Sequence, residues 1–125
     1  MVQTGLTDVM YAGNIRELEY TIVDEDNAGA PLNITSFRIK WAIAPLASDG
    51  SFSTTPTLVK DSTAGTQITK PTPASGICVV LLDPADTAAL GGRTFYMELE
   101  VFDASNNPIV VATGTLEIRR NIVNP

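Results

Sequence analysis

Carboxylates are the residues of this chain whose types and spacing could support acid–base or metal chemistry. They form three groups: an Asp-Glu-Asp-Asn run at 24–27, Glu17 with Glu19, and Glu98 with Glu100. The run at 24–27 could bind calcium through oxygen atoms, but it lacks the spaced carboxylates and distal glutamate of a calcium loop, so a solvated turn is favoured. Glycosidase carboxylates usually face each other across a cleft from different elements, so Glu98 and Glu100 are interpreted as one solvated strand face.

Other catalytic and cofactor-binding groups are scarce. The chain has no histidine, the commonest general base and metal ligand. Its one cysteine, Cys78, cannot build a zinc site or an internal disulfide, and its apolar surroundings favour a small buried side chain over a reactive thiol. No glycine-rich phosphate motif is present. We therefore predict that the protein is not an enzyme and has no catalytic residues, no metal site, no cofactor and no small-molecule substrate.

Length and charge limit the remaining classes of protein. A chain of 125 residues is large enough for one hydrophobic core, so a single domain spanning 1–125 is predicted. The formal net charge of −6 disfavours nucleic acid and anionic membrane surfaces as partners. No apolar run approaches the ~20 residues of a membrane-spanning helix, and the N-terminus lacks a signal-peptide pattern. We expect a protein that stays where it is synthesised and contacts neither nucleic acid nor membrane.

The clearest structural element spans residues 92–103. Apolar residues alternate there with Tyr96, Glu98, Glu100 and Phe102, and this period of two predicts a strand with one buried face. Because unpaired carboxylates are costly to bury, the face that carries both glutamates points outward. The inward residues are Phe95, Met97, Leu99 and Val101.

Three strands are predicted before this element. Residues 6–12 form a short edge strand, residues 15–23 alternate well, and residues 37–43 place Trp41 on an apolar face in mid-strand. The indole contributes much of the core area, provided that its N–H finds an acceptor. If the second and third strands are neighbours, charged residues pair across them: Glu17 and Glu19 with Arg38 and Lys40.

Residues 47–76 differ in composition from the predicted strands before them. They are rich in serine, threonine, proline and glycine, with two weak strands near 57–60 and 66–70. We interpret them as a long excursion with short edge pairing, which is either a solvated loop or a region that carries binding variation. Phe52 is the one aromatic residue of the excursion.

A buried strand and a helical turn follow the excursion. Residues 77–82 are continuously apolar, as expected of a strand that is covered on both sides. Asp83 can cap a helical turn near 84–90, Pro84 suits its first position, and Gly91 can end it.

These elements predict the fold class. A turn at 104–108 joins the 92–103 strand to a second apolar run at 109–118. About seven short strands with one short helical turn predict an all-β protein, an immunoglobulin-like antiparallel β-sandwich. A small open barrel is the alternative. The paired cysteines of antibody domains are absent, so packing alone must hold the core.

Several short motifs carry a resemblance over nearly the whole chain. They are YAGN at 11–14, VD and GAPLNIT within 23–35, LDPADTAAL at 82–90, YMELEV at 96–101 and GTLEI at 114–118. In these motifs the chain resembles small immunoglobulin-like proteins of tailed bacteriophages, a family that includes the N-terminal domain of siphophage baseplate upper proteins, which anchors a fibre to the virion. The resemblance implies an immunoglobulin-like fold and a non-enzymatic role, and it supplies no catalytic residues.

The resemblance leads to a functional expectation. The protein is expected to be a structural component of the virion, assembled in the host cytoplasm, that docks on the tail, neck or baseplate as an adaptor or decorates the capsid. Its partners are other virion proteins and, in a homo-oligomer, copies of itself. The alternative is a carbohydrate- or protein-binding module that uses residues 47–76.

Candidate partner contacts are apolar side chains that the predicted fold leaves outside the core. Two lie on the outward face of the 92–103 strand, and one lies in the excursion. The others lie in terminal segments that could act as arms, the N-terminal one adding a strand to a neighbour's open edge. These residues are Tyr96, Phe102, Phe52, Val2, Leu6, Ile122 and Val123.

Overall fold

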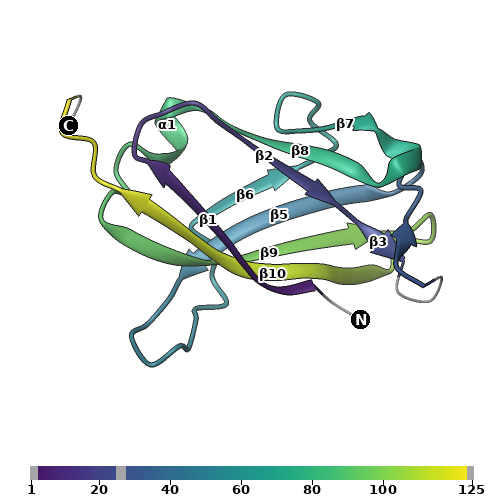
Figure 1. Cartoon of the computed structure of the whole chain (residues 1–125), viewed down its shortest axis with the longest axis horizontal. Helices are drawn as coiled ribbons and strands as arrows, with labels where there is room; N and C mark the ends of the chain where they lie inside the picture. The colour runs from purple at the N-terminus through teal and green to yellow at the C-terminus, as the bar shows by residue number, and fades with distance from the viewer. Residues whose placement is uncertain (1–2, 25–27, 124–125) are drawn as a thin grey trace.

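The computed structural model describes residues 3–24 and 28–123, and two β-sheets dominate them (Figure 1). The large sheet has five strands in the order β1 (Gln3–Tyr11), β10 (Pro108–Arg119), β9 (Arg93–Phe102), β5 (Arg38–Pro45) and β6 (Leu58–Asp61). The small sheet has the order β2 (Arg16–Thr21), β8 (Ile77–Leu82) and β7 (Ile68–Thr72). A two-residue ladder joins β3 (Val23–Asp24) to β4 (Ala30–Pro31), and the short helices are η2 (Pro73–Ser75) and α1 (Pro84–Thr87).

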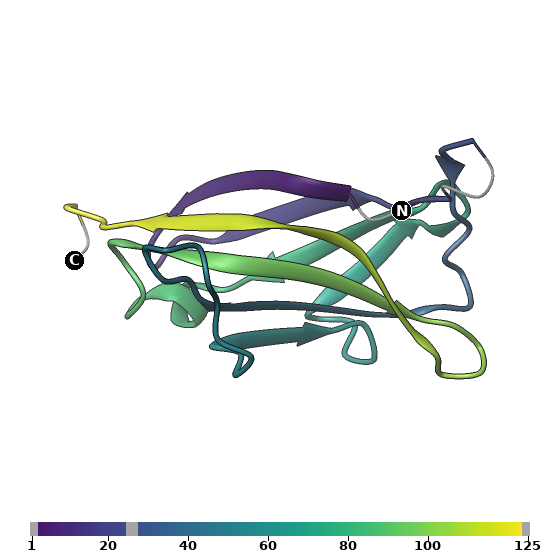
Figure 2. The same cartoon turned by 90° about the horizontal axis from the view of Figure 1, so that it is seen from below.

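The strand order is that of an immunoglobulin-like sandwich. In the large sheet, β10, β9, β5 and β6 follow the G-F-C-C′ order of a variable-type domain, and β2, β8 and β7 follow the B-E-D order of the facing sheet. The predicted all-β, immunoglobulin-like sandwich is therefore confirmed. Figure 2 shows the hairpin between β9 and β10 at the end of the molecule opposite the C-terminus.

One pairing departs from the predicted antiparallel arrangement, because β1 runs parallel to β10. The turn after β1 carries the chain from the large sheet to the small one, so β1 is not the hairpin partner of its sequence neighbour β2. It lies at the edge of the large sheet beside β10, as Figures 1 and 2 both show. Leu6 of β1 pairs with Gly114 of β10, and a Cβ on Gly114 would overlap the carbonyl oxygen of Leu6. This position therefore requires glycine.

The pairing of β1 corrects the prediction of a free N-terminal arm. Residues from Gln3 onward form a strand with β10 of the same chain, and Leu6 packs half-buried against the core. The prediction failed because a short uncharged segment gives no sign of where its partner lies. Val2 lies outside the described residues.

The central strand of the large sheet is β9, which pairs with both β10 and β5. Its inward residues are all buried, and its outward residues are partly exposed, as the alternation of the sequence predicts. The side chain of Trp41 on β5 lies beside Leu99 of β9 in register and is fully buried. The predicted face assignment is therefore correct.

Two local predictions in the second half of the chain need correction. In β8, Cys78, Val80 and Leu82 are buried, but the residues between them are partly exposed because no further sheet among the described residues covers the small sheet. The helical turn begins as predicted, with Asp83 at the N-cap and Pro84 first, but it ends at Thr87 with Ala88 as the C-cap instead of Gly91. The left-handed glycine of the following turn is Gly92, with φ at 84°.

A series of side-chain hydrogen bonds crosses the core between the two sheets. Trp41 donates a hydrogen bond from Nε1 to the hydroxyl oxygen of Tyr20 on β2, with 3.2 Å between the two atoms. The Tyr20 hydroxyl in turn donates to Asp8 Oδ2 on β1 at 3.5 Å. Burial raises the pKa of Tyr20, so its hydroxyl keeps its proton at neutral pH. The acceptor that the indole needs is thus supplied by the opposite sheet.

The predicted cross-strand charge pairs do not form. Glu17 and Glu19 lie on β2 of the small sheet, whereas Arg38 lies on β5 of the large sheet. Arg38 instead pairs with Asp61 on β6, with 2.7 Å between Nη2 and Oδ2. The prediction failed because the two strands, which follow one another among the predicted strands, belong to different sheets.

A second polar link holds α1 against the large sheet. Lys60 on β6 stands opposite Trp41 in register and is only 5% exposed. Its Nζ lies 2.7 Å from Oδ2 of Asp86 on α1. The same carboxylate accepts a hydrogen bond from the Asp83 backbone N–H at 2.7 Å, which ties the start of the helix to this ion pair.

The inter-sheet hydrogen bond gives a first prediction. Trp41→Ala should lower the free energy of unfolding by ~3–5 kcal/mol because it empties the centre of the core. Tyr20→Phe should cost ~1–3 kcal/mol because it leaves the buried indole N–H without an acceptor. Equilibrium denaturation measures both losses, and a Trp41→Ala loss below about 1 kcal/mol would contradict the core position.

The Lys60–Asp86 pair gives a second prediction with a definite sign. Asp86→Ala should destabilise the protein by roughly 3 kcal/mol, because it leaves a buried ammonium without its counter-charge. Adding Lys60→Met to that variant should restore part of the loss, since the unpaired charge is removed. The check is a double-mutant cycle by chemical denaturation, and a further loss on adding Lys60→Met would refute the buried-pair interpretation.

Candidate functional site

The candidate site lies on the outward face of the large sheet, where the connection between β5 and β6 folds back against β9. This connection projects beyond the sheet at the lower left of Figure 1. It carries Phe52, whose ring stacks on the ring of Tyr96 with 3.8 Å between centroids and 10° between planes. The structure therefore brings together two of the predicted contact residues, one from the excursion and one from the central strand.

A tight turn places Phe52. The Ala47 N–H donates to the Ser51 carbonyl, and Gly50 provides the positive φ of 89° that the turn requires. Asp49 Oδ1 accepts hydrogen bonds from the backbone N–H and the hydroxyl of Ser51, and these bonds lower the pKa of Asp49. A bridge between Phe52 and Leu46 then returns the chain to the end of β5.

A hollow of about 280 Å³ lies beside the stacked rings. On this side β5 places two alanines beside the rings: in register, Ala42 stands opposite Glu98 and Ala44 stands opposite Tyr96. The wall on the side of the connection carries hydroxyl groups. The lining residues are Ala42, Ile43, Ala44, Phe52, Ser53, Thr54, Pro56, Tyr96 and Glu98.

Tyr96 and Glu98 form a hydrogen-bonded pair at this hollow. The Tyr96 hydroxyl donates to Glu98 Oε2 at 2.9 Å. Partial burial and the neighbouring carboxylate raise the pKa of Tyr96 to about 12, so the phenol remains a donor at neutral pH. Within the described part of the chain, no lysine or arginine nitrogen lies within ion-pair distance of Glu98.

Phe102 lies at the other end of β9, ~20 Å from Tyr96 at a rise of ~3.3 Å per residue. Arg38 lies over its ring at 5.1 Å from the centroid, and Lys40 lies at 5.8 Å. Arg38 also donates from Nε and Nη2 to Asp61, and these bonds hold the pKa of that carboxyl down to about 2. Phe102 is therefore covered by its own chain and does not join Phe52 and Tyr96 in one surface.

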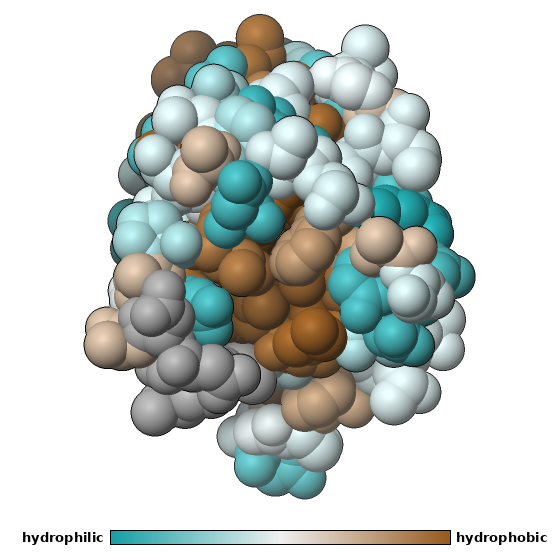
Figure 3. Space-filling model, turned by 90° about the vertical axis from the view of Figure 1, so that its right-hand side faces the viewer, coloured by the Kyte–Doolittle hydropathy of each residue, from teal (hydrophilic) through white to brown (hydrophobic). Residues whose placement is uncertain are grey.

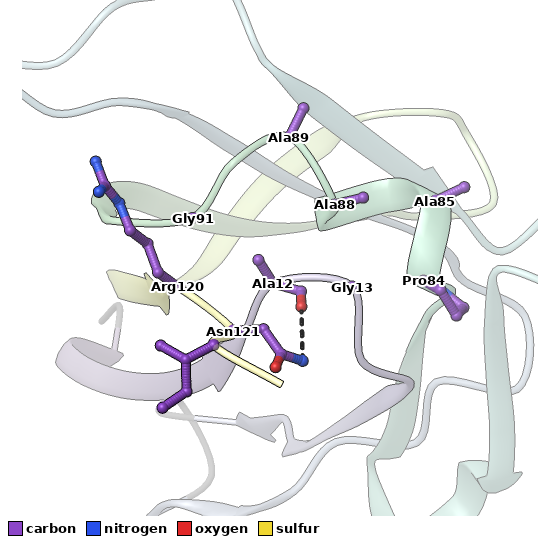
Figure 4. Close-up of a pocket in the computed structure, with 10 residues that line it drawn as sticks. Ala12, Gly13, Pro84, Ala85, Ala88, Ala89, Gly91, Arg120 and Asn121 are labelled. Carbon is purple, nitrogen blue, oxygen red and sulfur yellow. Dashed lines mark hydrogen bonds between the residues drawn. The ribbon is translucent and has the colours of Figure 1, made fainter. Parts of the chain in front are cut away.

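A second hollow, of about 720 Å³, lies between α1, the turn after β1 and the end of β10 (Figure 4). Asn121 turns toward the carbonyl oxygen of Ala12, to which its Nδ2 donates at 3.5 Å, and Arg120 extends beside Gly91. The predicted contact residue Ile122 also lines this hollow. The remaining lining residues are small and mostly apolar: Gly13, Pro84, Ala85, Ala88 and Ala89.

The remaining predicted contact residues do not share one surface. Ile122 and Val123 follow the end of β10 and are each 91% exposed. At the opposite end of the molecule, hydrophobic side chains gather in the middle of the surface that Figure 3 shows. The connection between β4 and β5, which lies at that end, includes the half-buried residues Leu32 and Phe37. Neither the large hollow nor this apolar end was predicted, because both are formed by segments distant in the chain.

Two residue groups that the sequence offered for chemistry can be placed in the described part of the chain. Cys78 is buried, and this burial raises the pKa of its thiol to about 12. No three histidine, cysteine, aspartate or glutamate residues within 3–24 and 28–123 gather as a metal site. Of the 24–27 run considered for calcium, 25–27 lie outside the described residues.

No helix in the described ranges is both long enough and apolar enough to span a bilayer. No family model matches the sequence, and no curated protein matches it.

The burial of Cys78 yields a third prediction. At pH 8 a thiol reagent such as Ellman's reagent should label the native protein far more slowly than the denatured protein, because both burial and the raised pKa suppress the thiolate. Absorbance of the released thiolate measures both rates. Equal rates would show that β8 opens readily and that Cys78 is accessible.

Proposed function

We propose that this protein is a non-enzymatic structural protein of a tailed-bacteriophage particle, a rigid immunoglobulin-like module that docks on other virion proteins. The observation that supports a docking role is the stacked pair of Phe52 and Tyr96 on the outward face of the large sheet. Aromatic side chains that are both exposed and held in place are typical anchors of protein interfaces. The assignment to a phage particle is supported by the resemblance of the sequence motifs.

The contacts that hold Phe52 and Tyr96 in place suit a docking role. Tyr96 belongs to the central strand β9, which is hydrogen-bonded on both sides, so its backbone cannot shift independently of the sheet. Phe52 is 47% exposed, and it is held by the Tyr96 ring and by the bridge to Leu46. A partner that covers these rings would bury apolar area with little loss of side-chain freedom.

A second candidate function is carbohydrate binding by the same face. The observation that favours it is the position of the Ser53 and Thr54 side chains beside the exposed ring of Phe52, since sugar sites combine an aromatic platform with hydroxyl and carboxylate groups. In this reading, as in the first, the connection between β5 and β6 carries the specificity.

Particle composition tests the proposal. Mass spectrometry of virions purified from the phage whose genome encodes this chain should detect the protein at a fixed copy number. Phe52→Ser should reduce incorporation by ~10-fold or more, because it removes an interface anchor. The matched control is Ile15→Ser, which removes a side chain that is 75% exposed in the turn before β2.

The outcomes of this experiment separate two claims. Absence of the wild-type chain from purified virions would refute the virion role. Normal incorporation of Phe52→Ser would leave the virion role standing but would refute docking through the aromatic pair. Equal losses for Phe52→Ser and Ile15→Ser would point to a general loss of folded protein, which thermal melting of the two isolated variants would reveal.

A further inference from the structure

The two ends of the outward face of β9 carry related groups but differ in their neighbours. At one end, the ring of Phe102 lies beneath the cations Arg38 and Lys40 of β5. At the other end, Tyr96 and Glu98 stand opposite Ala44 and Ala42 of β5 in register, and all four residues line the hollow. There the two cations are replaced by alanines, so an aromatic and acidic pair has no cationic neighbour on β5.

The other neighbours of Glu98 do not supply a charge. On β10, the residue opposite Glu98 is Thr113, and the residue opposite Tyr96 is Thr115. On β5, Ala42 stands opposite Glu98, and the nearest cation along that strand, Lys40, stands opposite Glu100. Glu98 is therefore a carboxylate that borders a hollow, accepts one hydrogen bond from Tyr96, and is flanked across the sheet by uncharged side chains.

We propose that the hollow beside Phe52, Tyr96 and Glu98 receives a basic side chain, arginine above all, from a partner protein. This proposal rests on the docking role proposed above and names the chemistry of the partner at this point. A guanidinium can lie against an aromatic ring and pair with a carboxylate at the same time, as Arg38 does with Phe102 and Asp61 within this chain. The incoming side chain would repeat that arrangement where β5 offers only alanine.

Size and charge favour this occupant over a sugar. The hollow of about 280 Å³ lies at the lower end of the range for small-molecule pockets and has room for one side chain. The chain carries a formal net charge of −6, so its surface attracts cationic groups. A neutral sugar could only donate hydroxyl hydrogen bonds to the Glu98 carboxylate, whereas a guanidinium donates hydrogen bonds and also supplies the counter-charge.

Ligand-observed and protein-observed NMR can test the proposal on the isolated chain. The probe is N-acetyl-L-arginine methylamide, and its matched control is the citrulline analogue, which has nearly the same shape but no charge. The arginine probe should give saturable shifts of the Phe52 and Tyr96 ring protons in the millimolar range, and the citrulline probe should bind at least ~5-fold more weakly. Added salt should weaken the arginine probe only.

Two variants locate the binding. Glu98→Gln removes the charge but keeps an acceptor for the Tyr96 hydroxyl, and it should weaken the arginine probe by ~5-fold or more. Glu100→Gln makes the same change two residues along the same face, opposite Lys40, and should alter binding by less than ~2-fold. Both variants should melt like the wild-type protein, because neither residue lies in the core.

Several outcomes would overturn the proposal. No saturable shift at ~100 mM arginine probe, equal binding of the citrulline probe, or an equal effect of the two variants would each refute a cation site at Glu98. Saturable binding of methyl β-D-glucopyranoside without binding of the arginine probe would favour the carbohydrate reading instead. These results do not depend on virion composition, so the proposal can fail while membership of the particle stands, and the reverse.

Discussion

The sandwich is built around the buried indole of Trp41, whose N–H donates a hydrogen bond to Tyr20 of the facing sheet. Immunoglobulin domains of antibodies place a tryptophan on the equivalent strand against a disulfide between the sheets, and this chain has one cysteine. Here the indole N–H of the large sheet donates to a hydroxyl of the small sheet, and that hydroxyl reaches Asp8 on the edge strand. These two hydrogen bonds thus link the large sheet, the small sheet and the edge strand β1 through the side chains of Trp41, Tyr20 and Asp8.

The ion pair of Lys60 and Asp86 extends this arrangement to the end of the sandwich. Lys60 stands opposite Trp41, so the packing of the indole and the position of α1 depend on each other. Because the inward positions of the large sheet are taken up by core packing, the docking surface proposed here lies on its outward face and on a connection. Tyr96, on which Phe52 stacks, belongs to the middle strand of that sheet, which is paired on both sides.

The candidate site shows how far residue patterns reach toward function. The alternation of β9 places Tyr96 and Glu98 outward, and composition marks the excursion that carries Phe52. The stacking of the two rings could not be predicted, because it depends on a turn around Gly50 that folds the excursion back. The hollow beside them depends on alanines of a different strand, whose register only the paired sheet reveals.

Local periodicity determined which faces of β2, β5 and β9 are buried, because alternation follows from the backbone geometry of a single strand. It also placed Pro84 at the start of α1, since proline suits a first helical position. Only the tertiary structure decided that β1 pairs parallel with β10, that β2 and β5 belong to different sheets, and that Glu98 stands opposite an alanine of β5. Those features depend on contacts between distant segments, which no local pattern encodes.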